Sequence, residues 1–171
     1  MIHYRKYAAL ALTALFLPSC STVGTMTERT VLIDPAEGAT LLGQCSRPGP
    51  TNAADYFTPS TREVTAIETS VARTLEANRA RYAANASLAF DWPRDPSLYN
   101  RQYVGFVMDG ERKIYGNFVP ARVATSSDRP VLICDGGPDL FGVQFDIATG
   151  EVDRIDFDGS RGGPMLEPIT R

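Results

Sequence analysis

The sequence has a single histidine, His3, which lies within the first 19 residues, a segment that we expect to be removed. The mature chain would then contain no imidazole. Ser-His-Asp and Cys-His catalysis both need a group that exchanges protons near neutral pH, and zinc sites usually use histidine or clustered cysteine. The sequence therefore assigns no catalytic residue, no cofactor and no metal site, and it favours a non-enzymatic role.

Basic residues are also few. Removing Arg5 and Lys6 with the first 19 residues leaves 15 basic residues against 20 acidic ones, a net charge of −5. Nucleic-acid binding needs a basic face, and attachment to anionic lipid by charge alone needs a polybasic segment. We therefore expect neither nucleic acid nor a lipid surface bound through charge to be a partner.

The first residues have the pattern of an export signal. The positively charged stretch MIHYRK precedes the uncharged apolar run 8–17, whose ten residues are too short to cross a bilayer as a helix and suit a signal peptide. The following Leu17-Pro18-Ser19-Cys20 resembles the lipobox of bacterial lipoproteins, although a proline at its second position is unusual.

That resemblance implies lipid attachment at Cys20, cleavage before it, and anchoring by several acyl chains. Residues 1–19 would be the signal peptide and 20–30 a tether. Because Ser21 follows the cysteine, and retention in the inner membrane is mainly associated with Asp there, the resemblance implies an outer-membrane lipoprotein that faces the periplasm. The alternative is an ordinary secretory signal that is cut after Ser21.

The other two cysteines are Cys45 and Cys134. An even number of cysteines in an oxidising compartment predicts a disulfide between them. The alternative is a pair of buried free thiols.

The rest of the chain predicts one α+β domain over residues 31–160, followed by a loose tail at 161–171. A capping box, Ser60-Thr61-Arg62-Glu63, begins a helix whose apolar stripe includes Val64, Ile67, Val71, Leu75 and Tyr82. We expect this long helix to precede and cover an antiparallel meander of four or five strands, at 100–108, 111–119, 131–134, 141–145 and 152–157. The order of elements is similar to cystatin-like and NTF2-like rolls.

Two strands flank Asp109-Gly110, a pair typical of a type I′ hairpin turn. The segment from Tyr99 to Gly159, with its Tyr99–Gly105, Lys113–Phe118 and Cys134–Gly137 motifs, also resembles small uncharacterised exported bacterial proteins. That resemblance implies no particular activity.

Two motifs suggest ion or phosphate binding. Asp156, Asp158, Ser160 and Glu167 match positions of a calcium-binding EF-hand loop, but Arg161 occupies the position that needs glycine. The simpler interpretation is a strand followed by a turn. Likewise, Cys134–Pro138 is glycine-rich but lacks the Lys-Ser/Thr ending of a phosphate-binding loop, which favours a turn held by the disulfide.

Four residues of the predicted hairpin form a candidate binding face: Arg101, Tyr103, Tyr115 and Asn117. Tyrosine rings are typical of binding surfaces. The alternative is that Tyr103 and Tyr115 pair across the two strands and only stabilise the hairpin. We therefore expect a lipid-anchored binding module for an envelope component or protein. The alternatives are a ligand-binding or enzymatic pocket in an NTF2-like roll, and a structural envelope lipoprotein.

Overall fold

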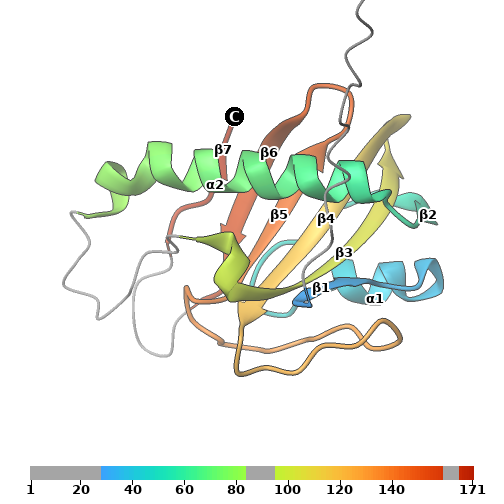
Figure 1. Ribbon diagram of the computed structural model, residues 1–171, viewed down its shortest axis with the longest axis horizontal. Coiled ribbons are helices and arrows are strands. Elements are labelled where there is room, and N and C mark those ends of the chain that lie inside the picture. The colour runs from blue at the N-terminus through green and yellow to red at the C-terminus, as the bar shows by residue number, and fades with distance from the viewer. Residues whose placement is uncertain (1–27, 84–94, 160–165) are drawn as a thin grey trace, which may run out of the picture.

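The computed structural model describes residues 28–83, 95–159 and 166–171. Its helices and strands (Figure 1) are, in chain order, β1 (Thr30–Leu32), α1 (Gly38–Leu42), β2 (Ala54–Phe57), α2 (Thr61–Ala83), β3 (Tyr99–Met108), β4 (Glu111–Pro120), β5 (Phe141–Asp146), β6 (Glu151–Phe157) and β7 (Ile169–Thr170). Short 3₁₀ turns at Pro35–Glu37 and Pro96–Leu98 precede α1 and β3.

The centre of the fold is an antiparallel meander of β3 to β6. Strands β3 and β4 pair without a bulge from Tyr99 opposite Pro120 to Met108 opposite Glu111. The turn between them has Asp109 at φ 54° and Gly110 at φ 81°. Positive φ at both positions is what a type I′ turn requires, so the predicted hairpin is confirmed.

The expected architecture around this meander is wrong. The sheet has seven strands, with β1 parallel to β3, β2 on the same edge of β3, and β7 on the outer edge of β6. Among the described residues, the only helix before β2 is the five-residue α1, so the long helix does not lead the domain. The rolls suggested by the expected order of elements are not supported, and the fold is a mixed α/β sheet.

The structure also differs from the expected strands at two places in the chain. Segment 131–134, expected as a strand, belongs to the loop between β4 and β5. Strand β7 lies in the region that was expected to be a loose tail: Ile169 is buried and pairs with Ile155. These errors share a cause, because strands of two to four residues carry too little periodicity to be recognised without their partners.

Helix α2 covers one face of the sheet (Figure 1). The backbone N–H of Ser60 donates to Glu63 Oε2 at 2.7 Å, and that of Glu63 donates to Ser60 Oγ at 3.3 Å, so the capping box is present. The predicted stripe packs on sheet residues that include Tyr103, Ile114 and Phe118. Each fully buried Val, Ile or Leu stabilises the fold by about 1.5–3 kcal/mol, which accounts for the position of α2.

Aromatic rings extend this core toward the end of the sheet. The rings of Phe118 and Phe141 stack with centroids 4.6 Å apart. Tyr99 contacts Phe141 edge-on at 5.2 Å, and Tyr103 contacts Phe118 edge-on at 5.9 Å. Such pairs add about 0.5–1.5 kcal/mol beyond the area they bury.

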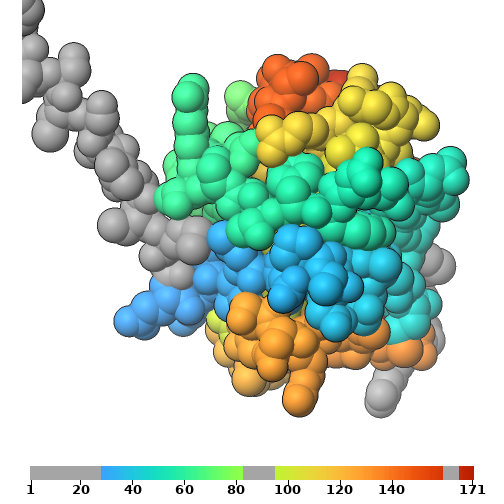
Figure 2. Space-filling view, turned by 90° about the vertical axis from the view of Figure 1, so that its right-hand side faces the viewer, coloured from blue at the N-terminus to red at the C-terminus, as the bar shows by residue number. Residues whose placement is uncertain are grey.

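The opposite face of the sheet is covered without a long helix. Ile33, Leu41 and Leu42 from the N-terminal segment pack on Val104 and Phe106. Figure 2 shows this blue segment between the green residues of β2 and α2 and the orange loop that follows β4. The domain therefore has three layers, and its third layer consists mainly of loops.

A disulfide ties these loops together. Cys45 in the loop after α1 is bonded to Cys134 in the loop before β5, with Cα atoms 5.3 Å apart and 89 residues of separation. The predicted disulfide is confirmed. Cys20, the residue expected to carry lipid, lies outside the described residues, and no helix in the described parts of the chain is long and apolar enough to cross a membrane.

Candidate functional site

The four residues of the predicted binding face do not share a face. Arg101 and Tyr103 lie on the side of the sheet that α2 covers, whereas Tyr115 and Asn117 lie on the opposite side. All four are at most 3% exposed. Tyr103 lies opposite Gly116 rather than Tyr115, so the cross-strand pair is absent as well. Both interpretations of these residues are wrong.

Arg101 and Tyr103 instead join α2 to the sheet. Both reach Glu68 of α2: Arg101 Nη1 lies 3.4 Å from Glu68 Oε1, and the Tyr103 hydroxyl donates to the same oxygen at 3.3 Å. Burial, reinforced by the nearby Glu68, raises the pKa of Tyr103 well above its ordinary value. Tyr103 therefore stays a neutral hydrogen-bond donor.

Asn117 holds the long loop between β4 and β5. Its side-chain amide donates to Val131 O at 3.0 Å, and the neighbouring Gln102 accepts from Val131 N at 2.8 Å. Gln102 also donates to the carbonyl oxygens of Ser126 and Arg129, at 3.1 and 2.8 Å. A loop over a sheet carries backbone groups that need partners, and these buried amides supply them.

Tyr115 belongs to a buried network around Arg47. The Arg47 guanidinium donates to the Tyr115 hydroxyl at 3.1 Å, to Asn117 Oδ1 and to Asp158 Oδ1. Burial raises the pKa of Asp158, and the adjacent Arg47 opposes that shift. The network joins the loop after α1 to β4 and to the end of β6. Its role is therefore structural.

The acidic residues of the calcium-binding pattern form separate ion pairs with three different arginines. Asp156 pairs with Arg154 at 2.6 Å, Asp158 pairs with Arg47, and Glu167 pairs with Arg81 at 2.8 Å. Ser160 and Arg161 lie outside the described residues. Within the described ranges, no three acidic, histidine or cysteine side chains converge in a way that could hold a metal ion.

The glycine-rich segment after β4 is a turn. Asp135 and Gly137 have φ of 56° and 79°, and Gly137 N donates to Gly159 O at 2.9 Å. The disulfide at Cys134 anchors its start. This geometry agrees with the turn that the sequence favours.

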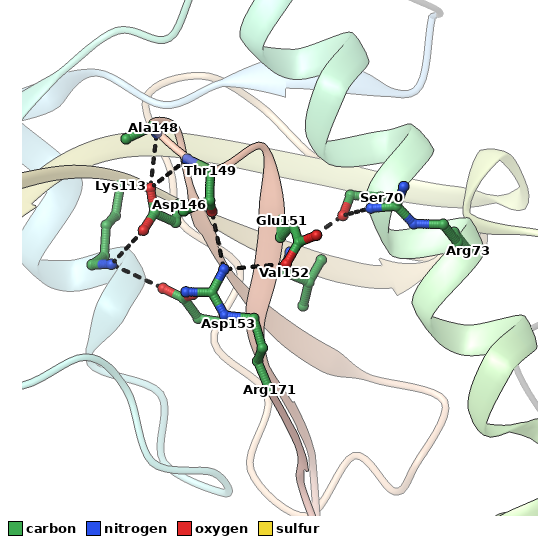
Figure 3. Close-up of polar contacts among 10 residues, drawn as sticks. All are labelled: Ser70, Arg73, Lys113, Asp146, Ala148, Thr149, Glu151, Val152, Asp153 and Arg171. Carbon is green, nitrogen blue, oxygen red and sulfur yellow. Dashed lines mark hydrogen bonds and ion pairs between the residues drawn. The ribbon is translucent and has the colours of Figure 1, made fainter.

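A different site is present where α2 passes over the edge of the sheet (Figure 3). There a groove of about 330 Å³ lies between the helix and the β6–β7 edge. This volume is at the lower end of the range for ligand sites. The helix contributes Ser70, Arg73, Thr74, Ala77 and Asn78, and the edge contributes Glu151, Val152, Ile169, Thr170 and Arg171.

Comparison with protein-family models, with curated proteins and with solved structures finds no match for this chain. The chemistry of the groove must therefore be derived from its own residues.

The edge of β6 beside the groove is already capped. The Val152 N–H donates to Ser70 Oγ of α2 at 3.2 Å, and the Arg171 N–H donates to Asp153 O at 3.1 Å. An exposed strand edge offers unpaired backbone groups to another chain, but here these groups are occupied. A ligand in the groove would therefore be recognised through side chains rather than by strand addition.

The two arginines of the groove differ in their partners. Arg171 Nη1 lies 3.3 Å from Glu151 Oε2, and its Nη2 lies 3.2 Å from Asp153 Oδ1. Arg73 is exposed and donates only to Ser70 Oγ, at 3.4 Å. No carboxylate of the described residues lies within ion-pair distance of Arg73, so it is the uncompensated charge of the groove.

Behind the groove, the buried Lys113 forms ion pairs with three acidic side chains. Lys113 Nζ lies 2.9 Å from Asp153 Oδ2 and 3.4 Å from Asp146 Oδ2 (Figure 3), and it also lies 2.9 Å from Glu111 Oε2. Burial alone would lower the pKa of Lys113, but these carboxylates outweigh it and raise the pKa above its ordinary value. Asp153 thus bridges Lys113 and Arg171, which keeps Arg171 at the edge of the groove.

Asp146 closes the turn between β5 and β6. Its Oδ1 accepts from the backbone N–H groups of Ala148 and Thr149, at 2.8 and 3.1 Å. Burial acts to raise the pKa of Asp146, but these two amides and Lys113 outweigh it, so the pKa lies below its ordinary value. The turn and the β6 edge are consequently held in one geometry.

Sequence reasoning missed the groove residues. No motif in the sequence singles out Ser70, Arg73 or Arg171. The groove joins α2 to a strand edge about 80 to 100 residues later in the chain, and no local pattern marks such a junction.

Proposed function

We propose that this protein is a non-enzymatic, lipid-anchored binding module of the bacterial cell envelope, which uses the groove between α2 and the β6–β7 edge to hold an acidic segment of a partner protein. The resemblance of Leu17–Cys20 to a lipobox supports anchoring at Cys20. The Cys45–Cys134 disulfide supports an oxidising compartment. Outer-membrane attachment with the domain in the periplasm is part of this proposal.

The observation that carries the binding role is the uncompensated Arg73. The groove around it combines apolar surface from Ala77, Val152 and Ile169 with polar groups from Thr74 and Asn78. A guanidinium presents several donors that match a carboxylate. A side-chain carboxylate of a peptide would complete its pairing, and the peptide chain would cover the apolar surface.

The proposal is tested by photo-crosslinking in envelope preparations, with the crosslinking residue placed at Thr74 in the groove. The matched position is Thr65, which is exposed on the same helix outside the groove. We expect a defined protein adduct from position 74 and none from position 65. Equal labelling from both positions, or no adduct from position 74, would contradict the proposal.

The role of charge is tested with Arg73→Ala against Arg62→Ala, since both arginines are exposed on α2 and have no carboxylate partner among the described residues. Loss of a charge-assisted contact should weaken binding of the crosslinked partner's acidic segment by about tenfold. Raising the salt concentration should weaken wild-type binding and affect the Arg73→Ala variant less. Equal affinities of the two variants would exclude Arg73 as the contact.

Anchoring is tested separately by replacing Cys20 with Ser and following the incorporation of radiolabelled palmitate. We expect label in the wild-type chain and none in the variant, together with release of the variant from membranes. Unchanged incorporation would contradict lipid attachment at Cys20 and leave the groove proposal untouched.

A further inference from the structure

A second cavity, of about 250 Å³, lies on the face of the sheet opposite α2. Tyr115 of β4, Gln144 of β5 and Arg154 of β6 lie side by side across its floor, because each is the register partner of the next. Asp156 and Met108 complete the sheet side, and the loop 48–51 forms the opposing wall.

The wall of this cavity is rigid. It contains Pro48 and Pro50, whose rings fix φ. A Cβ at Gly49 would overlap the carbonyl oxygen of Leu42, so the loop is pressed against the end of α1. The loop begins just after Cys45 of the disulfide. A site held in this way loses little conformational freedom when a ligand binds.

The floor is fixed by the Arg47 network. A Cβ at Gly142 would overlap both the Tyr115 hydroxyl and Arg47 Nε, so the glycine leaves the space that these two side chains occupy above β5. The Tyr115 oxygen accepts from Arg47 Nε at 3.1 Å. The hydroxyl proton of Tyr115 has no acceptor among the described residues.

The other polar groups of the cavity also have unused capacity. The Gln144 side-chain amide forms no hydrogen bond with any described residue, although it is half-buried. Arg154 Nε pairs with Asp156 Oδ2 at 2.6 Å, and this leaves its terminal NH₂ groups and the other Asp156 oxygen without partners in the described chain. The site therefore offers donors and acceptors next to each other with no net charge.

We propose that this cavity binds one ring of a neutral saccharide. A polyhydroxylated ring presents alternating donors and acceptors that match Tyr115, Gln144, Arg154 and Asp156, while its C–H faces pack on Met108 and the proline wall. An ionic ligand would find no uncompensated charge, because Arg154 and Asp156 neutralise each other. The volume, below the range of about 300–1,000 Å³ for larger ligands, limits the contact to a single ring. This site is independent of the α2 groove.

The test is saturation-transfer difference NMR on the intact domain with methyl β-glucoside and N-acetylglucosamine as neutral probes and glucuronate and glucosamine as charged ones. We expect saturation of ring protons for the neutral probes at millimolar concentration, and at least fivefold weaker signals for both charged probes. Gln144→Ala, whose side chain holds nothing else in place, should weaken neutral binding by about fivefold, the effect of one hydrogen bond.

Arg62→Ala serves as the control, since Arg62 is exposed on α2, lines neither cavity and should leave saccharide binding unchanged. Absence of transfer with wild-type protein would overturn the proposal. So would equal signals from the wild type and Gln144→Ala, or a preference for a charged probe. None of these outcomes bears on partner binding in the α2 groove, which the crosslinking at Thr74 reports.

Discussion

The Arg47 network makes a sharp prediction about stability. Arg47 is 4% exposed, and Asp158, its carboxylate partner, is 2% exposed. Replacing Arg47 with Met would leave the Asp158 carboxylate buried without a cation. Removing one member of a buried ion pair costs about 3–5 kcal/mol, against a total stability of about 5–15 kcal/mol for a domain. We expect a loss of that size for Arg47→Met at neutral pH.

The double variant Arg47→Met/Asp158→Asn separates the charge from the hydrogen bonds. Asparagine has no charge to desolvate, so the double variant should recover about 1–3 kcal/mol of the loss. The contacts that it still lacks are those from Arg47 to Tyr115 and to Asn117. At about 1 kcal/mol for each hydrogen bond, the double variant should remain about 2 kcal/mol below the wild type.

The sign of the pH dependence follows from the pKa of Asp158. Burial raises that pKa, and Arg47 opposes the shift, so the pKa should rise further in Arg47→Met. An acid whose folded pKa exceeds its unfolded value destabilises the fold when it is ionised. That cost disappears as the pH falls through the folded pKa. The gap between Arg47→Met and the double variant should therefore narrow toward acid pH.

Urea unfolding followed by circular dichroism measures these differences, with unchanged m values indicating the same unfolding reaction. A gap between the two variants that does not depend on pH would refute the assignment of the loss to a buried carboxylate. So would a loss of less than about 1 kcal/mol in Arg47→Met, because an exposed ion pair has that strength.

Three further predictions follow from the same structure. Gly142→Ala should cost about 1–3 kcal/mol in urea unfolding, since its Cβ would displace the Tyr115 hydroxyl; unchanged stability would show that the floor of the cavity adapts. Replacing Cys45 and Cys134 with Ser should cost up to about 4–5 kcal/mol, because the disulfide spans 89 residues; the reduced wild type should match the variant. Asp146→Asn should flatten the decrease in the free energy of unfolding at acid pH. The folded-state pKa of Asp146 lies below its unfolded value, so the ionised carboxylate stabilises the fold, and this stabilisation is lost as the pH falls through the folded pKa. Identical pH profiles for the variant and the wild type would contradict this.

Local signals in the sequence predicted the elements that depend on neighbouring residues. The capping box at Ser60 and Glu63 and the positive φ at Asp109 and Gly110 are each decided within a few residues, and both are present. The disulfide was predictable once Cys20 was set aside for lipid attachment, because two cysteines then remain for an oxidising compartment. Strands β2 and β7 were not, because each has two to four residues and is defined only by pairing with β3 or β6.

The candidate binding face failed for a related reason. Polar residues within strands suggested a surface, yet Arg101 and Asn117 are almost completely buried. Alternation places side chains on two faces, but it does not tell which segment covers a face. Arg101 meets α2, and Asn117 meets a loop from beyond β4. Without those contacts, a buried polar residue and a binding residue look alike in the sequence.

The three-layer arrangement also explains where sites can exist. One long helix covers a single face of the sheet, so the N-terminal segment and the loop after β4 must cover the other. Loops satisfy their backbone groups through side chains such as Gln102 and Asn117, and these residues are fully committed. In the described part of the chain, both Arg73 and Gln144 lie where a covering layer ends. Arg73 of α2 lies beside the β6–β7 edge of the sheet, and Gln144 of β5 lies beside the loop 48–51. Both proposed sites are at such boundaries, while the polar centre between them serves the fold.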